Sequence, residues 1–184
     1  DMDNDGDTDI IATALNDDEV IVYTNETSGL ATASFVTNTV STSADGASGV
    51  FLADMDNDGD MDIVSSSIFD DAITWYENDG AANPSWVAAD IATTADAATS
   101  VFAADMDNDG DIDIVSSSGD DDAITWYENN GEANPSWTAA DIATNADYAT
   151  AIYVADMDND GDMDIISSSA NDDAIAWYEN NGAA

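Results

Sequence analysis

The chain contains no lysine, arginine, histidine or cysteine among its 184 residues. It carries 41 aspartate and glutamate residues, so its formal net charge is −41 at pH 7. A protein without basic side chains cannot neutralise phosphate groups, which argues against nucleic acid and anionic membrane surfaces as partners. It also has no imidazole base, no thiolate nucleophile and no amine for a Schiff base. With no catalytic constellation visible, we expect that the chain is not an enzyme.

The same absences restrict the metals that the chain can bind. Zinc, copper and haem sites usually take histidine or cysteine ligands, which this sequence lacks. Carboxylate oxygen is its only charged ligand, and it suits hard cations such as Ca²⁺ and Mg²⁺. Because a compact chain with this much charge of one sign repels itself, we expect cations to be part of the native state.

Long apolar runs are absent as well. No run approaches the roughly 20 residues of a membrane-spanning helix, so we expect no membrane insertion. Without cysteine there is no disulfide pattern to indicate a compartment, and no signal-peptide pattern is visible. The sequence opens directly inside a motif at Asp1, so we expect it to be a section of a longer protein.

What the chain does contain is a repeat of about fifty residues. The string DMDNDGD begins at four positions that are 53, 51 and 51 residues apart: Asp1, Asp54, Asp105 and Asp156. A second string, DDAITWYEN or a variant of it, follows each copy at a fixed offset: from Asp17, Asp70, Asp121 and Asp172. This periodicity predicts one repeat domain, 1–184, with repeats at approximately 1–49, 50–100, 101–151 and 152–184.

Each period divides into four short strands. In the third repeat, apolar and β-branched residues with strand-like alternation predict strands over 101–104, 112–116, 123–127 and 137–143. A helix over 86–99 is rejected because that stretch has no continuous apolar stripe. Four antiparallel strands per period predict an all-β fold of β-propeller-type blades. About 3.6 periods are present, and the first lacks its entering strand and the last its closing strand, so we expect a section of a larger propeller or repeat array.

The repeated aspartate loop, D-x-D-x-D-G-D-x-D, is a candidate calcium site. Aspartates at positions 1, 3 and 5 can converge on one ion, glycine at position 6 permits a sharp turn, and position 7 can offer its carbonyl. An EF-hand is excluded because position 12 is alanine or serine instead of glutamate: Ala12, Ser65, Ser116 and Ser167. The closing carboxylate is instead at position 9, within a strand hairpin.

Each loop is therefore predicted to hold one calcium ion, about four in all. The predicted metal-site residues are the twenty loop aspartates: Asp1, Asp3, Asp5, Asp7, Asp9, Asp54, Asp56, Asp58, Asp60, Asp62, Asp105, Asp107, Asp109, Asp111, Asp113, Asp156, Asp158, Asp160, Asp162 and Asp164. The alternative is a set of solvated acidic turns. Retention of every aspartate and glycine in four copies argues against it, as does the repulsion among five carboxylates in nine residues.

The strings DMDNDGDMDIVSSS and DDAITWYEN together resemble the FG-GAP/VCBS-type repeats of bacterial extracellular proteins, relatives of the calcium-bearing blades of integrin α-subunit propellers. The resemblance covers essentially the whole chain. It implies a β-propeller with the loop between the first two strands of a blade, and a role in surface display or adhesion. It also implies one ion held by the side chains of Asp54, Asp56, Asp58 and Asp62 and the carbonyl of Asp60, with matching positions in the other loops. The FG and GAP tripeptides themselves are missing, so the VCBS-like branch is closer.

Two groups of residues have alternative interpretations. Trp75, Trp126 and Trp177 recur at one place in the repeat, and packing between blades is favoured over sugar stacking. Trp86 and Trp137 follow a Pro-Ser turn and are the better sugar candidates. Adjacent pairs such as Asp121-Asp122 and Asp172-Asp173 could serve as acid and base of a glycosidase, but a solvated turn is favoured.

The leading hypothesis is a calcium-binding repeat module, extracellular or on a bacterial cell surface, with a structural or adhesive role. One alternative is a carbohydrate-binding propeller. Another is a subunit of a self-assembling extracellular fibre, because open strand edges invite pairing with another chain. The expected partners are calcium ions, with glycans or neighbouring protein subunits as further candidates.

Overall fold

A computed structural model describes residues 1–27 and 32–182 and shows an all-β chain. No helix capable of crossing a membrane occurs within these two stretches. The strands form four antiparallel sheets, two of three strands and two of four. In chain order the sheets contain β1 (Ile10–Ala14), β2 (Glu19–Asn25) and β3 (Phe35–Ser41); β4 (Ala47–Ala53), β5 (Asp62–Ser67), β6 (Ala72–Asn78) and β7 (Trp86–Ala92); β8 (Ala98–Ala104), β9 (Asp113–Ser118), β10 (Ala123–Asn129) and β11 (Trp137–Ala143); and β12 (Ala149–Ala155), β13 (Asp164–Ser169) and β14 (Ala174–Tyr178).

Each sheet is a simple up-and-down meander, so neighbours in sequence are neighbours in the sheet. The four strands predicted for the third repeat correspond to β8–β11, and the stretch 86–99 contains strand β7 and no helix. The first sheet lacks an entering strand and the last lacks an outer strand, as the repeat boundaries predicted. The fold-class prediction is therefore confirmed at the level of the individual blade.

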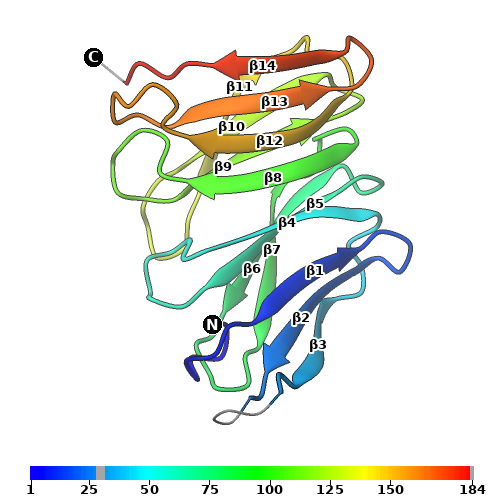
Figure 1. Ribbon diagram of the computed structural model, residues 1–184, viewed down its shortest axis with the longest axis vertical. Helices are drawn as coiled ribbons and strands as arrows, with labels where there is room; N and C mark the ends of the chain where they lie inside the picture. Colours follow the sequence, from blue (N-terminus) through cyan, green and yellow to red (C-terminus); the bar gives the residue numbers. More distant parts are fainter. Residues whose placement is uncertain (28–31, 183–184) are drawn as a thin grey trace.

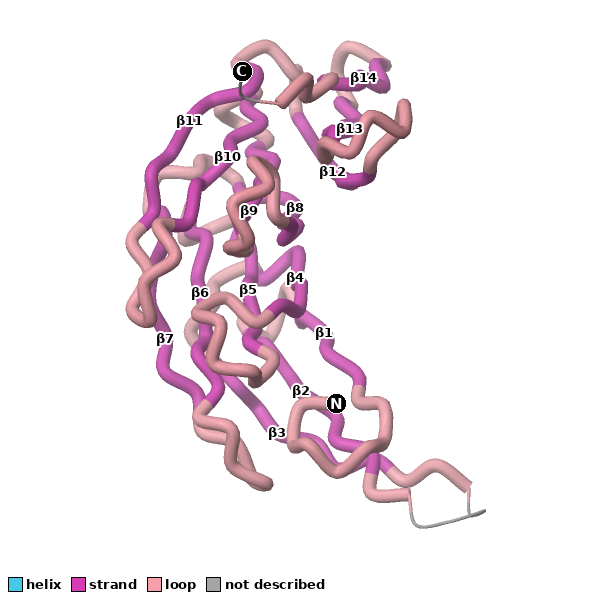
Figure 2. Tube along the Cα trace, turned by 90° about the vertical axis from the view of Figure 1, so that its left-hand side faces the viewer, coloured by secondary structure: helices cyan, strands magenta, loops and turns pink. Residues whose placement is uncertain are grey.

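The sheets stack face to face along the long axis of the molecule (Figure 1). Their first strands make the main contacts, with β4 against β8 and β8 against β12. The outer strands β7 and β11 lie along the opposite side of the stack (Figure 2). The described part of the chain thus forms an open arc of propeller-like blades and does not close into a ring.

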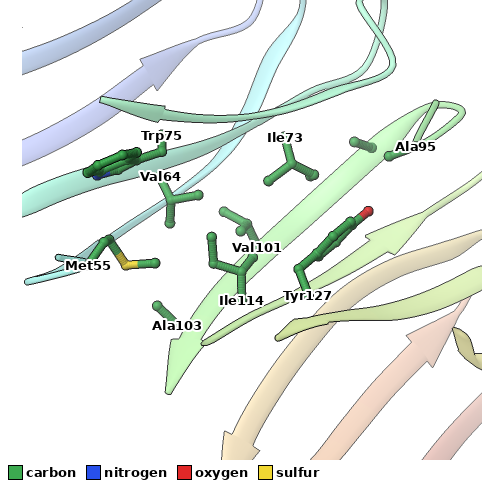
Figure 3. Close-up of a cluster of buried hydrophobic side chains, with 10 residues drawn as sticks. Met55, Val64, Ile73, Trp75, Ala95, Val101, Ala103, Ile114 and Tyr127 are labelled. Carbon is green, nitrogen blue, oxygen red and sulfur yellow. The ribbon is translucent and has the colours of Figure 1, made fainter. Parts of the chain in front are cut away.

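The hydrophobic core lies between consecutive sheets. Met55, Ile73 and Trp75 of the second repeat pack against Val101 and Ile114 of the third (Figure 3). Equivalent residues form the other two interfaces. Each sheet therefore buries its apolar side chains by stacking on the next, as repeat architectures do. The prediction that Trp75 packs between blades is confirmed, because its side chain is 3% exposed.

Small hydroxyl residues let the first two strands of neighbouring sheets approach closely. Every residue of β5 and of β9, both with the sequence DIVSSS, is buried. Ser48 Oγ lies 3.0 Å from Ser66 Oγ in its own sheet and donates a 2.8 Å hydrogen bond to the Ala98 carbonyl of the next sheet. Thr99 repeats the second contact one repeat later, with the Ala149 carbonyl at 2.8 Å. The serine-rich strands are thus part of the interface between sheets.

In the last three sheets, the isoleucine of the third strand is buried only where another sheet packs over it. Ile73 and Ile124 are 0% exposed, whereas the equivalent Ile175 of β14 is 83% exposed. Trp177, on the same strand, is 51% exposed, so the prediction that it packs between blades is wrong for this residue. No sheet in the described part of the chain lies over this face of β12–β14.

This difference provides a matched test of the stacking. Ile124→Ala should lower the free energy of unfolding by about 2–5 kcal/mol, because it leaves a cavity between two sheets. Ile175→Ala, the same change at the same repeat position, should alter it by no more than about 0.5 kcal/mol. Urea unfolding followed by circular dichroism would measure both, and equal effects would contradict the stacked arrangement.

Candidate metal centre

The four aspartate loops occupy one place in the repeat. Three of them join the first strand of a sheet to the second: β4 to β5, β8 to β9 and β12 to β13. The remaining loop, beginning at Asp1, leads directly into β1. The resemblance implied this placement, and the structure confirms it.

The backbone of each loop is wrapped around the aspartate at position 1. In the second loop, Asp54 Oδ1 accepts a hydrogen bond from the Asp58 N–H at 3.1 Å, and Asp54 Oδ2 accepts one from the Gly59 N–H at 3.0 Å. Gly59 has a φ of +100°, and a Cβ built there would meet nothing within 4 Å. The glycine is therefore required for its left-handed backbone and not for lack of space. The first loop has the same bonds, from the N–H groups of Asp5 and Gly6 to Asp1, at 3.0 and 2.9 Å.

Carboxylate oxygens converge in every loop. Three oxygens, one from each of three aspartates, lie within 4.8 Å of one another in four clusters: Asp1, Asp3 and Asp5; Asp54, Asp56 and Asp58; Asp105, Asp107 and Asp113; Asp156, Asp158 and Asp160. Oxygens that each lie about 2.4 Å from one calcium ion are at most about 4.8 Å apart, so the spacing fits that ion. Position 9 belongs to the cluster in the third loop, and position 5 takes its place in the other three.

The aspartate at position 9 closes the loop against the sheet. Asp62 is fully buried, and its two oxygens accept hydrogen bonds from the Asn78 N–H at 2.8 Å and the Met55 N–H at 3.1 Å. The same pair of bonds occurs at Asp9, Asp113 and Asp164. A carboxylate oxygen has two lone pairs, so each can still accept a further partner such as a cation.

The carboxylate of the aspartate at position 7 does not point into the oxygen cluster and contacts neighbouring residues instead. Asp111 Oδ1 accepts a 2.8 Å hydrogen bond from Asn57 Nδ2 of the preceding loop. The carboxylate also lies against Gly131, where an added Cβ would come within 2.0 Å of Asp111 Oδ2. Position 7 appears in none of the four oxygen clusters. Of this residue, the backbone carbonyl is the group available to an ion.

Comparison with known proteins agrees with the repeat and its loop. The family profile of the FG-GAP-like repeat matches residues 1–65, 66–116 and 109–167. The chain belongs to the FG-GAP-like repeat family. Members of this family are generally non-enzymatic and typical of extracellular proteins. A search of individually curated proteins gives no match.

Two groups of residues in these repeats, the tryptophans and the adjacent aspartate pairs, had alternative interpretations in the sequence. Trp75 is 3% exposed, so its ring is not available as a platform for a sugar. The indole N–H of Trp126 is buried as well, but its ring is only partly buried and lines a pocket together with Tyr178. Trp86 and Trp137 are partly buried against the core clusters. The aspartate pairs lie in turns. Asp121 Oδ2 accepts a 2.9 Å hydrogen bond from the Asp96 N–H of the preceding repeat. Asp122, with a φ of +55°, accepts one of the same length from the Tyr148 N–H, just before β12. The Asp121-Asp122 pair therefore helps to connect consecutive sheets.

Sequence reasoning missed the asparagine that ends the WYEN string. Asn78 is 1% exposed, and its Nδ2 donates to the carbonyls of Met61 at 3.0 Å and Met2 at 3.2 Å. Met61 belongs to the loop of the same repeat and Met2 to the loop of the preceding one. The available signal was that all four copies of the string end in asparagine: Asn25, Asn78, Asn129 and Asn180.

Burial gives the loop carboxylates an unfavourable environment when no cation is bound. Desolvation raises the pKa of Asp62 and of Asp113 to about 6, from an ordinary value of 3.8, and hydrogen bonds offset only part of this. Desolvation and the neighbouring Asp58 also raise the pKa of Asp56. At Asp164, desolvation is outweighed by hydrogen bonds from the Asn180 and Met157 N–H groups, and the pKa is lowered.

These pKa shifts predict opposite pH dependences with and without metal ions. An acid whose pKa is higher in the folded state contributes stability below its unfolded pKa, and that contribution is lost as pH rises through the folded value. Without ions, the melting temperature should therefore rise when pH is lowered from about 7 to about 5. With calcium, which holds the carboxylates ionised and so lowers their pKa, it should fall over the same range. Scanning calorimetry with calcium or with EGTA would measure both slopes, and the same sign in both conditions would contradict the prediction.

Proposed function

We propose that this chain is a calcium-stabilised extracellular repeat module with a structural or adhesive role, holding four ions, one in each aspartate loop. The observation that carries the proposal is the convergence of three carboxylates in every loop, around which the loop backbone turns with hydrogen bonds to the aspartate at position 1. Family membership and the absence of any basic side chain support it further. Glycans or neighbouring subunits are the candidate partners of the adhesive role.

The proposed ligands are the side chains at positions 1, 3, 5 and 9 and the carbonyl at position 7. In the second loop these belong to Asp54, Asp56, Asp58, Asp62 and Asp60. An all-oxygen set from a single loop favours Ca²⁺, which accepts six to eight ligands in flexible geometry. Mg²⁺ demands a near-ideal octahedron and tends to keep several waters, so it suits such a loop less well.

Ion binding would offset the repulsion among the loop carboxylates. Extracellular calcium modules bind with dissociation constants of about 10⁻⁴ to 10⁻³ M. An ion present at about 100 times its dissociation constant adds roughly 2.7 kcal/mol per site. Domains of ordinary size are stable by only about 5–15 kcal/mol, so four such sites would decide whether the chain is folded.

Removal of calcium should therefore unfold or loosen the chain. EGTA should lower the melting temperature by at least about 10 °C, since roughly 2–4 °C is expected per kcal/mol for a chain of this size. Circular dichroism melting with calcium and with EGTA would measure the change. Addition of Mg²⁺ at the same concentration serves as the control and should restore less of the stability. An unchanged melting temperature in EGTA would contradict the proposal.

One loop can be disabled by a substitution that removes a single negative charge. A control substitution elsewhere removes the same charge and leaves the loops intact. Asp107→Ala removes one converging carboxylate, and the number of calcium ions bound should fall from four to three, because affinity depends on the count of charged ligands. Glu132→Ala removes the same charge from an exposed turn and should leave four. Isothermal titration calorimetry would count the ions, and an equal effect of the two variants would indicate diffuse counter-ion binding.

A further inference from the structure

We propose that neighbouring aspartate loops bind their ions cooperatively, because two asparagine side chains at each junction tie one loop to the next. This inference rests on the proposed function, since it concerns the same four loops. It assigns positioning roles to residues that lie outside the proposed ligand set. These are the asparagine at loop position 4, the aspartate at position 7, and the asparagine that ends the WYEN string.

The first link is exposed and joins position 4 of one loop to position 7 of the next. Asn57 stands between Asp56 and Asp58, both members of the second oxygen cluster. Its Nδ2 donates a 2.8 Å hydrogen bond to Asp111 Oδ1. The Asp111 N–H in turn donates to Oδ1 of Asp109 at 2.9 Å. The link therefore begins next to two proposed ligands of the second loop and ends on one of the third.

The second link is buried and joins the same two loops below the surface. Asn129, 1% exposed, donates from Nδ2 to the Met55 carbonyl at 2.9 Å and to the Ile112 carbonyl at 3.0 Å. Its own N–H donates to Asp113 Oδ1 at 2.8 Å. Met55 is position 2 of the second loop, whereas Ile112 and Asp113 are positions 8 and 9 of the third. Because an unsatisfied buried amide or carbonyl is costly, the two loops must keep their relative placement.

Both links recur at every junction between consecutive loops. The exposed links are Asn4 to Asp60 at 2.9 Å, Asn57 to Asp111 at 2.8 Å and Asn108 to Asp162 at 2.8 Å. The buried links are Asn78 to the Met2 carbonyl at 3.2 Å, Asn129 to the Met55 carbonyl at 2.9 Å and Asn180 to the Met106 carbonyl at 2.8 Å. A contact made three times in the same geometry is a property of the repeat.

These links couple the loops through their conformational order. Without an ion, repulsion among five carboxylates opposes the closed loop, and binding must supply the free energy of ordering it. Once one loop is closed, its asparagine holds position 7 of the next loop in place, so the second ion orders less of the chain. Repulsion between ions acts in the opposite direction. It is small, because a loaded loop still has more negative than positive charge and because salt screens charges over about 8 Å. We expect a loaded neighbour to raise the calcium affinity at least about fivefold.

Calcium titration of the full chain by calorimetry, at about 0.15 M salt, tests the coupling. The unmodified chain should bind four ions with a Hill coefficient above about 1.5. The triple variant Asn4→Gly, Asn57→Gly and Asn108→Gly removes the exposed links and keeps the buried ones. It should still bind four ions, but with a Hill coefficient lower than that of the unmodified chain. Glycine is chosen because these asparagines have φ values of 58°, 60° and 62°, which glycine adopts without strain.

Asn159→Gly provides the matched control. Asn159 occupies the same loop position with a φ of 64°, and within the described residues it makes no link to another loop. Its variant should keep the cooperativity of the unmodified chain. Non-cooperative binding of four ions by the unmodified chain would overturn the coupling while leaving the proposed function intact. So would a triple variant with the same Hill coefficient as the unmodified chain. Absence of calcium binding in the unmodified chain would overturn both. If the triple variant does not fold, the single variant Asn57→Gly must lower the Hill coefficient, and its failure to do so overturns the coupling.

Discussion

Repulsion among carboxylates is the constraint on which the rest of this structure depends. The chain has a net charge of −41 and no basic side chain, so no ion pair with a Lys, Arg or His side chain can form. It nevertheless gathers five aspartates into each nine-residue loop and buries one of them completely, as at Asp62 and Asp113. Backbone N–H groups, together with the indole of Trp75 or Trp126, lower the pKa of these two carboxylates, but burial outweighs them and leaves the pKa of Asp62 and Asp113 at about 6. Bound calcium would supply the missing positive charge, and so join folding to ion binding.

The stacked sheets hold the four aspartate loops in equivalent positions. Three loops are closed by the first residue of a strand (Asp62 in β5, Asp113 in β9 and Asp164 in β13), and the first loop is closed by Asp9 just before β1, so each is held by the sheet itself. Stacking then brings consecutive loops within hydrogen-bond reach of one another. The hydrophobic interfaces and the loops consequently depend on the same register. A change in how two sheets pack would also misalign the asparagine links between their loops.

The sequence predicted the features that arise within one repeat. The period, the four strands of a blade, the loop and its closure at position 9 all follow from turn chemistry and strand alternation over short distances. The packing of Trp75 between sheets was also predicted, because the residue recurs at one place in the repeat. Whether four calcium ions occupy the loops remains a prediction.

The features that the sequence did not predict involve contacts between repeats. Asn57 reaches Asp111 across 54 residues, and Asn129 reaches Met55 across 74. Asparagine is common in turns, so its presence at these two positions does not reveal that its side chain links one loop to another. The sequence predicted a section of a larger propeller or array, but not the curvature of the stack, because the packing of one sheet on the next determines it. The burial of the serine strands also depends on this packing, because Ser65 or Ser116 alone carries no signal of a buried position.

The central claim is that each aspartate loop holds one calcium ion. Anomalous diffraction from crystals grown with calcium would test it most directly. Four anomalous peaks are expected, one per loop, each about 2.3–2.6 Å from carboxylate oxygens at positions 1, 3 and 5. Empty loops in crystals grown with millimolar calcium, or peaks only at other acidic residues on the surface, would contradict it.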